Sequence, residues 1–305
     1  MDGFSIASKQ SEAERAQIDD LTRLNADDLV HAFKLDRAGP LRGVFHSLAR
    51  IPARRFSRQI LAFDNLVGEQ GLAAGGRYIM KMFARQFDIF GDEYIPEQGP
   101  LLVVCNHPGM ADAMALWVAL ERRADIRIIA AERELLNAVP NTSRYLMYVA
   151  ERSGGRTGLL RAAAQHMRSG GAILNFPAGH IEPDPTVSPG ALDSLQSWSQ
   201  SVALFLRLVP EATLLPAAVG GVISGTAMRN PVIRFLPTEK ERDWAAATLQ
   251  VLIPAYRDTH TRVAFGPPVA AHELLALGDA AAIARAVTRR VAPLLAQAAG
   301  GSLLL

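Results

Sequence analysis

From residue 86 onward, short apolar runs alternate with stretches of helical periodicity, and this alternation constrains the fold more than any other feature of the sequence. It predicts an α/β domain whose mostly parallel central sheet is flanked by helices. Runs such as 101–104 are apolar at consecutive positions, which is typical of strands buried on both faces. The expected strands are FDIFG, LLVVC, IRIIA, YVAE, AILNF, TLLPAAV and RVAFG, and the expected helices lie near 111–122, 132–147, 156–168, 190–209, 241–253 and 280–298.

Residues 11–85 have helical spacing without strand-like runs, which predicts an N-terminal helical extension. Pro52 should interrupt the helix that begins near Leu41, because proline removes a backbone donor and clashes with the preceding turn. We therefore expect two domains, a helical segment over 1–85 and an α/β domain over 86–305. In the run TLLPAAV, Pro216 favours an edge strand or a strand end.

Composition limits the cellular setting and the partners. The 305 residues are 49% hydrophobic and 20% charged, enough for an ordinary globular core. The single cysteine, Cys105, excludes an intrachain disulfide and favours a reduced, cytoplasmic location. The N-terminus lacks the apolar core of a secretory signal, and no apolar run reaches the roughly 18–20 residues of a membrane span. A net charge of +2 gives no argument for a nucleic-acid partner.

Positive charge is nevertheless concentrated in one stretch. Residues 37–63 contain six arginines and no Asp or Glu. Such a block indicates either a solvated helix face or a surface for an anionic partner. An apolar row of Leu41, Val44, Phe45, Leu48 and Ile51 runs through it, and Phe56, Ile60, Leu61 and Phe63 follow as a second apolar set.

Polar residues follow the apolar run LLVV directly, where ligands of α/β sheets gather. His107 stands three residues beyond the run, and Asp112 lies near the start of the next helix. Pro108 and Gly109 favour a turn that can fold the carboxylate back onto the imidazole. A carboxylate on one ring nitrogen raises the basicity of the other, which produces a general base. The alternative is a helix-start histidine followed by a first-turn acid.

Two further strand ends carry groups suited to an anion. The run AILN leads into Phe176-Pro177-Ala178-Gly179, a tight turn whose amides could meet phosphate. The segment YVAERSGGR presents Arg152 and Arg156 beside a glycine turn, and guanidinium groups suit phosphate. Glycine-rich nucleotide loops and a G-x-S-x-G nucleophile elbow are absent from the sequence.

Taken in order, the blocks NHPGMAD (106–112), VAERSGG (149–155), FPAGHIEP (176–183) and LLPAAV (214–219) resemble the four blocks of the glycerolipid acyltransferase superfamily, with its lysophosphatidic acid and glycerol-3-phosphate acyltransferases. RVAFGPPV (262–269) is similar to their late strand. The resemblance implies that His107 is the general base and Asp112 its orienting partner. It also implies a substrate site formed by Asn106, Gly109, Arg152, Arg156, Phe176, Pro177, Ala178, Gly179, His180 and Glu182.

The implied reaction is phospholipid biosynthesis by O-acyl transfer. A fatty acyl group would pass from acyl-CoA or acyl carrier protein to a lysophospholipid or glycerophosphate-type acceptor. These thioesters are co-substrates, and we expect no permanently bound cofactor and no metal. Backbone amides near Gly109 would stabilise the oxyanion. The acceptor resides in a bilayer, so we expect a peripheral protein that meets an anionic membrane surface through its N-terminal helices.

The third block departs from the superfamily's usual Phe-Pro-Glu-Gly-Thr-Arg. Ala178 replaces the carboxylate, His180 replaces the hydroxyl, and no arginine follows. The identity of the acceptor therefore stays open, and the alternative for His180 is a turn residue bonded to the backbone. A hydrolase and an inactive lipid-binding protein remain alternatives. In the helix after Asp112, Met114 and Trp117 are either core residues or the lining of an acyl groove.

Overall fold

The computed structural model describes residues 2–35, 39, 42–149 and 155–301. The strands in this part of the chain are β1 (Ala84–Phe90), β2 (Leu101–Val104), β3 (Arg127–Ala131), β4 (Leu146–Val149), β5 (Ala172–Asn175), β6 (Thr213–Gly220), β7 (Thr259–Phe265) and β8 (Val269–Ala270). The principal helices are α1 (Asp2–Ala32), α2 (Arg42–Gln70), α3 (Leu72–Phe83), α4 (Ala111–Ala119), α7 (Gly155–Arg168), α9 (Ser201–Leu208), α12 (Glu239–Leu252) and α14 (Ala280–Ala298). Short helices are α5 (Glu134–Asn137), α6 (Pro140–Ser143), α8 (Ala191–Ser194), α10 (Gly225–Met228), α11 (Pro231–Arg234) and α13 (Ala271–Leu275), with single turns η3 (Asp92–Tyr94), η4 (Leu195–Ser197) and η5 (Pro254–Tyr256).

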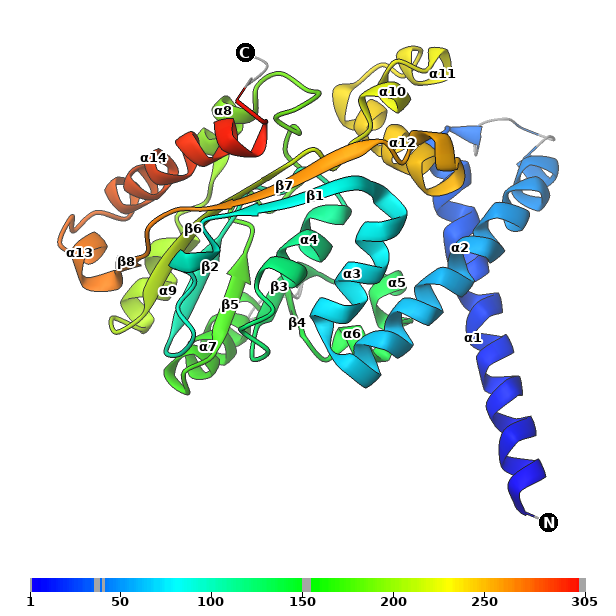
Figure 1. Cartoon of the computed structure of the whole chain (residues 1–305), viewed down its shortest axis with the longest axis horizontal. Coiled ribbons are helices and arrows are strands. Elements are labelled where there is room, and N and C mark those ends of the chain that lie inside the picture. Colours follow the sequence, from blue (N-terminus) through cyan, green and yellow to red (C-terminus); the bar gives the residue numbers. More distant parts are fainter. Residues whose placement is uncertain (1, 36–38, 40–41, 150–154, 302–305) are drawn as a thin grey trace. The chain divides into compact units, whose positions relative to one another are not determined.

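Within the described residues, eight strands form one sheet in the order β1-β7-β6-β2-β5-β3-β4, and β8 pairs with β6 (Figure 1). Strands β6, β2, β5, β3 and β4 are parallel to one another, and β7 is antiparallel to β6. The expected α/β class with a mostly parallel sheet and an N-terminal helical region is confirmed. All seven strands expected from the sequence are present.

Side-chain alternation divides the core between the two faces of the sheet. Leu102 and Val104 of β2, with Ile173 of β5, belong to a large apolar cluster that includes residues of α7, α9 and α14. Helices α3 and α4 pack against each other, and α4 also contacts β6 and β7. Gly76 permits this approach, since a Cβ there would lie 2.7 Å from the Met114 carbonyl oxygen of α4. Because β2, β5 and β6 are parallel neighbours, their carboxyl ends lie side by side at the same edge of the sheet.

Two expectations for prolines were wrong. Helix α2 runs through Pro52 without a break, because Ala53, Ser57 and Ile60 just beyond it are buried and their packing offsets the lost hydrogen bond. Pro216 lies inside the central strand β6, not at an edge. On the side of β7 and β8, β6 pairs with β8 up to Leu214 and with β7 from Ala217, so the missing proline donor falls between the two partners.

The chain divides into two compact units: 1–69 with 133–144, and 70–132 with 145–305. The expected domain boundary after residue 85 stays a prediction. In the first unit, Leu21, Ile60, Leu61 and Val139 form a small core. The predicted helix over 132–147 is instead the pair α5 and α6, and the Asp64 carboxylate accepts bonds from the main chain of Asn141 and Thr142 beside it. None of the described helices is long and apolar enough to cross a membrane.

Candidate active site

The imidazole of His107 and the carboxylate of Asp112 are in contact just beyond β2. Nδ1–H of His107 donates to Oδ2 of Asp112 at 2.7 Å. Asp112 sits in the first turn of α4 and is fully buried, whereas the His107 side chain keeps 27% of its surface exposed. The turn expected at Pro108 and Gly109 produces this contact. A buried carboxylate on Nδ1 fixes the tautomer and leaves Nε2 as the ring nitrogen with a lone pair that can accept a proton.

The main-chain amide of Gly109, a candidate for binding the oxyanion, is bonded within the protein. Its N–H donates to Oδ2 of Asp112 at 3.0 Å, so this amide orients the carboxylate. A Cβ at Gly109 would lie 3.3 Å from Cγ2 of Val222, which explains why a glycine suits the position. The Asp112 carboxylate therefore closes the turn between His107 and Asp112, because it accepts from both the His107 ring and the Gly109 amide.

The FPAGH segment lies against the same histidine. The ring of Phe176, directly after β5, stacks on the imidazole of His107 with 4.5 Å between centroids and 25° between planes. The N–H of Gly179 donates to the carbonyl of Phe176 at 3.0 Å, and Gly179 has φ +69°, so the expected tight turn through Pro177 and Ala178 is present. His180 is exposed, and its Nδ1 bonds to the carbonyl of Ala178 at 2.8 Å, as the backbone-bonded reading anticipated.

Two residues expected to bind substrate have protein partners instead. Asn106 is 1% exposed, and its amide bonds both the N–H and the C=O of Val219, at 2.8 and 2.9 Å, which ties β2 to β6. Glu182 is also 1% exposed, and its carboxylate accepts from the main-chain N–H of His107 at 2.9 Å. Both residues are almost fully buried, and they connect the loops around His107 and Asp112.

Sequence reasoning missed three residues that complete these loops. The hydroxyl of Ser194 and the indole N–H of Trp198 both donate to Oε1 of Glu182, at 2.9 and 2.8 Å. The buried carboxylate of Asp184 accepts the consecutive main-chain N–H groups of 221–223, at 2.9, 2.7 and 3.0 Å. Gly221 has φ +69°, and a Cβ there would lie 2.0 Å from the His260 carbonyl oxygen. The only available signal was the pattern Glu-Pro-Asp-Pro at 182–185.

The remaining predicted site residues are less informative. Trp117 is 4% exposed and its Cβ faces Gly76 of α3, a core position, while Met114 is half-buried. Arg152 lies outside the described residues, and the side chain of Arg156 is likewise not described. Among the described residues, no group of three or more His, Cys, Asp or Glu side chains could hold a metal ion.

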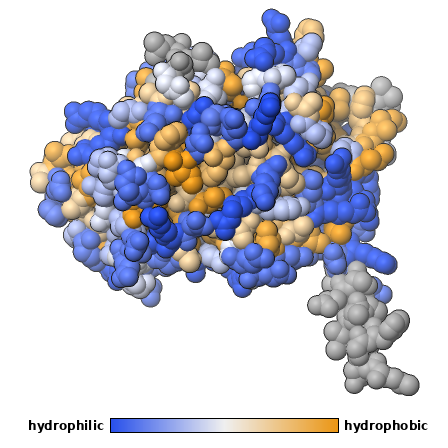
Figure 2. Space-filling view, viewed as in Figure 1, coloured by the Kyte–Doolittle hydropathy of each residue, from blue (hydrophilic) through white to orange (hydrophobic). Residues whose placement is uncertain are grey.

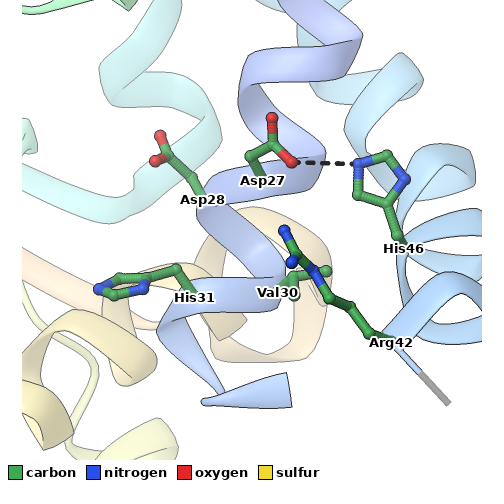
Figure 3. A pocket seen from close by; sticks show the side chains of 6 residues that line it. All are labelled: Asp27, Asp28, Val30, His31, Arg42 and His46. Carbon is green, nitrogen blue, oxygen red and sulfur yellow. Dashed lines mark hydrogen bonds and ion pairs between the residues drawn. The ribbon is translucent and has the colours of Figure 1, made fainter. Parts of the chain in front are cut away.

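A pocket of about 390 Å³ lies in the first unit, between the end of α1 and the start of α2 (Figure 3). Nε2 of His46 contacts Oδ1 of Asp27 at 3.1 Å. Burial raises the pKa of Asp28, and the charge of Arg133 opposes that rise. The pocket contains none of the residues predicted to act on substrate; its lining is Asp27, Asp28, Val30, His31, Arg42 and His46.

Comparison with protein families identifies the class. Residues 86–219, which contain the catalytic pair and the FPAGH segment, match the family model described as Acyltransferase. This match agrees with the resemblance of the sequence blocks and supports an acyltransferase enzyme.

Among solved structures, the chain is similar to the 1-acyl-sn-glycerophosphate (LPA) acyltransferase PlsC from Thermotoga maritima. The two are 16% identical over 80% of this chain and 82% of the other, with a TM-score of 0.46. No curated protein matches the sequence.

Proposed function

We propose that the protein transfers a fatty acyl group from acyl-CoA or acyl carrier protein to a hydroxyl of a lysophospholipid or glycerophosphate-type acceptor, with His107 as the general base. The observation that carries the proposal is the 2.7 Å contact between Nδ1 of His107 and Oδ2 of Asp112 inside an acyltransferase domain. The role in phospholipid biosynthesis follows from this acceptor class.

The chemistry follows from that pair. Nε2 of His107 takes the proton of the acceptor hydroxyl while its oxygen attacks the thioester carbonyl carbon. The negatively charged Asp112 stabilises the imidazolium that forms. When the tetrahedral intermediate collapses, the C–S bond breaks and the imidazolium returns the proton to the departing thiolate. The ester and a free thiol leave, and no covalent enzyme intermediate is needed.

The acceptor's phosphate would lie near the turn 176–179 and the guanidinium groups of Arg152 and Arg156. The main support is positional, because the Phe176 ring stacks on His107 and so brings this turn next to the base. His180 provides an exposed imidazole at the same turn, where the superfamily has a hydroxyl. A cationic or hydrogen-bonding group here suits a phosphate-bearing headgroup.

The first half of α2 supports a role at a membrane surface on the cytoplasmic side. Val44, Leu48 and Ile51 recur at helical spacing and are 54, 58 and 74% exposed. Figure 2 shows apolar side chains at the surface over the first turns of α2, next to hydrophilic ones. The exposed arginines of this half could meet anionic headgroups while the apolar row enters the acyl boundary.

Part of the expected membrane face is wrong, because its second apolar set is used for folding. Ile60, Leu61 and Phe63 are buried, at 8, 4 and 5% exposure, and Ile60 and Leu61 pack in the core of the first unit. Phe45 and Phe56 are half-buried, and Leu41 lies outside the described residues. The proposed contact is thus confined to the row Val44, Leu48 and Ile51.

Acyl-CoA and a panel of lysolipids, incubated with the purified chain, test the function. Free thiol and lipid products are measured together by a thiol reagent and by mass spectrometry. Cys105 will not disturb the thiol reading, because it is buried and burial raises its pKa well above the usual range. New diacyl product supports acyl transfer, free fatty acid would indicate a hydrolase, and inertness would indicate a lipid-binding protein.

A further inference from the structure

Glu182 joins the loop of the base to the loop of the FPAGH segment through two opposed hydrogen bonds. The N–H of His107 donates to Oε2 of Glu182 at 2.9 Å, and the N–H of Glu182 donates to the carbonyl of His107 at 2.8 Å. Both main-chain polar groups of the base are therefore held by one residue that lies 75 positions along the chain. Asp112 orients the ring of His107, and Glu182 fixes the backbone from which that ring extends.

The carboxylate of Glu182 is itself held rigidly. Its other oxygen, Oε1, accepts from the hydroxyl of Ser194 at 2.9 Å and from the indole N–H of Trp198 at 2.8 Å. Trp198 is part of the main apolar core. Burial raises the pKa of Glu182, and the three donors to its oxygens oppose that rise. With 1% of its surface exposed, the residue has a fixed position and faces protein groups rather than a substrate.

We infer that Glu182 is the positioning residue for the catalytic base: its carboxylate fixes the main chain of His107 and so keeps the imidazole on Asp112 and aimed at the acceptor hydroxyl. This inference rests on the proposed function of His107. It assigns to Glu182 a role in turnover rather than in substrate affinity. Displacing a reacting group by about 1 Å can cost roughly 10²-fold in rate.

The donor arrangement makes Glu182→Gln a sharp test. A glutamine has the same shape but carries one NH₂ group, and all three neighbours of the carboxylate are donors. If the NH₂ takes the place of Oε2, it faces the N–H of His107. If it takes the place of Oε1, it faces the indole N–H of Trp198. Either orientation breaks the arrangement without changing the volume of the side chain.

A second substitution should repair this conflict. Trp198→Phe removes the indole donor, so the glutamine NH₂ can occupy that side while its oxygen still accepts from His107. The Ser194 oxygen also lies 2.8 Å from the carbonyl of Ala191, so in the variant its single proton can be donated there while its oxygen accepts from the NH₂. The double variant should therefore restore the position of His107 that the single variant loses.

The experiment compares wild type, Glu182→Gln, Trp198→Phe and the double variant, with Glu273→Gln, at an exposed position of α13, as the matched control. We expect Glu182→Gln to lower kcat about 10²-fold with KM for both substrates within about threefold. The double variant should recover at least tenfold of that loss, and Glu273→Gln should match wild type. The inference is overturned if Glu182→Gln lowers only the melting temperature, or if it raises the acceptor KM with kcat unchanged. It is also overturned if the double variant is no faster than Glu182→Gln.

A readout independent of turnover separates this inference from the proposed function. The ¹⁵N resonances of the His107 ring, assigned by their loss in His107→Ala, report its position and its titration. We expect them to shift in Glu182→Gln and to return toward wild type in the double variant. Unchanged resonances would overturn the inference even in an active enzyme. If wild type turns over no lysolipid but the resonances shift as expected, the proposed function fails and the positioning role stands.

Discussion

The loops around His107 bury polar groups, whereas the first half of α2 exposes apolar ones. Near His107, the acids Asp112 and Glu182 and the amide of Asn106 are buried, and each is bonded to main-chain groups. On α2, apolar side chains such as Leu48 and Ile51 stand in solvent. Proton transfer requires a fixed geometry, so every group around it is held. Adsorption to a fluid bilayer requires only a face of suitable chemistry.

The largest expected effect on activity is at His107, among the rigidly bonded loops. His107→Ala should lower acyl transfer by about 10²–10⁴-fold, the usual contribution of a general base. The melting temperature should change little, since the side chain is partly exposed and the main-chain bonds to Glu182 remain. Rates and thermal unfolding are measured on the same preparation. A folded variant that turns over at the wild-type rate would end the proposed mechanism.

On α2, charge rather than a fixed geometry should determine binding to anionic vesicles. Changing Arg50, Arg54, Arg55 and Arg58 to Gln together should weaken binding to anionic vesicles by about 3–4 kcal/mol, at about 1 kcal/mol per arginine near the surface. Arg54 already pairs with Asp19 at 2.5 Å, so its share should be the smallest. Co-sedimentation at low and high salt measures the effect. Wild type that stays in the supernatant at low salt would assign these arginines to solvent alone.

Asp243 of α12 gives a third case, an acid that is buried without the dense bonding of the catalytic loops. Its carboxylate accepts a long hydrogen bond from the Ser188 hydroxyl at 3.3 Å, and burial, aided by the charge of Glu239, raises its pKa to about 6. Because the folded state holds this proton more tightly than the unfolded state, the stability from this group is full below pH 4 and is lost as pH rises through 6.

Ionisation of Asp243 above pH 6 should lower the free energy of unfolding of the wild type by about 3 kcal/mol, and Asp243→Asn should avoid this loss. We expect the variant to be more stable than wild type at pH 8 and the difference to shrink toward pH 5, in urea unfolding followed across that range. Equal pH dependence in the two proteins would mean that Asp243 ionises as freely as a surface acid.

The smallest effect sharpens the contrast within α2 itself. Ile51→Ala should weaken vesicle binding by up to about 2 kcal/mol, through three lost methyl or methylene groups, and leave stability almost unchanged because Ile51 is 74% exposed. Ile60→Ala on the same helix is the control. Since Ile60 is buried, it should cost about 2–5 kcal/mol of stability and leave vesicle binding of the folded protein intact. If both variants changed vesicle binding and stability alike, the distinction between a membrane-facing Ile51 and a core Ile60 would be wrong.

The sequence predicted the fold and the contact between His107 and Asp112 because both depend on local patterns. Apolar runs located seven of the eight described strands of the sheet, all but the two-residue β8, and Pro108 with Gly109 indicated the turn that brings Asp112 onto His107. The errors at Pro52 and Pro216 have a common cause. Propensity rules describe isolated elements, and here burial of neighbouring side chains and a change of strand partner outweigh them.

What the sequence did not reveal depends on contacts between distant loops. Glu182 was expected to bind substrate, because nothing local shows that its oxygens meet Ser194, Trp198 and the main chain of His107. Asn106 was misjudged for the same reason, since Val219 lies 113 residues away. The type of a polar residue can be read from the sequence, whereas its partner is set by the way the loops close over the sheet edge.

The turn from Phe176 to Gly179 has a consequence for how enzymes of this kind diverge. It closes on its own backbone, and the exposed His180 bonds only within the turn, to Ala178. The hydrogen bonds to the main chain of His107 come two positions later, from Glu182. If the acceptor binds at this turn as proposed, mutation at position 180 would alter the choice of acceptor without moving His107. New lipid substrates could then arise by natural selection at this turn while the contact between His107 and Asp112 stays intact.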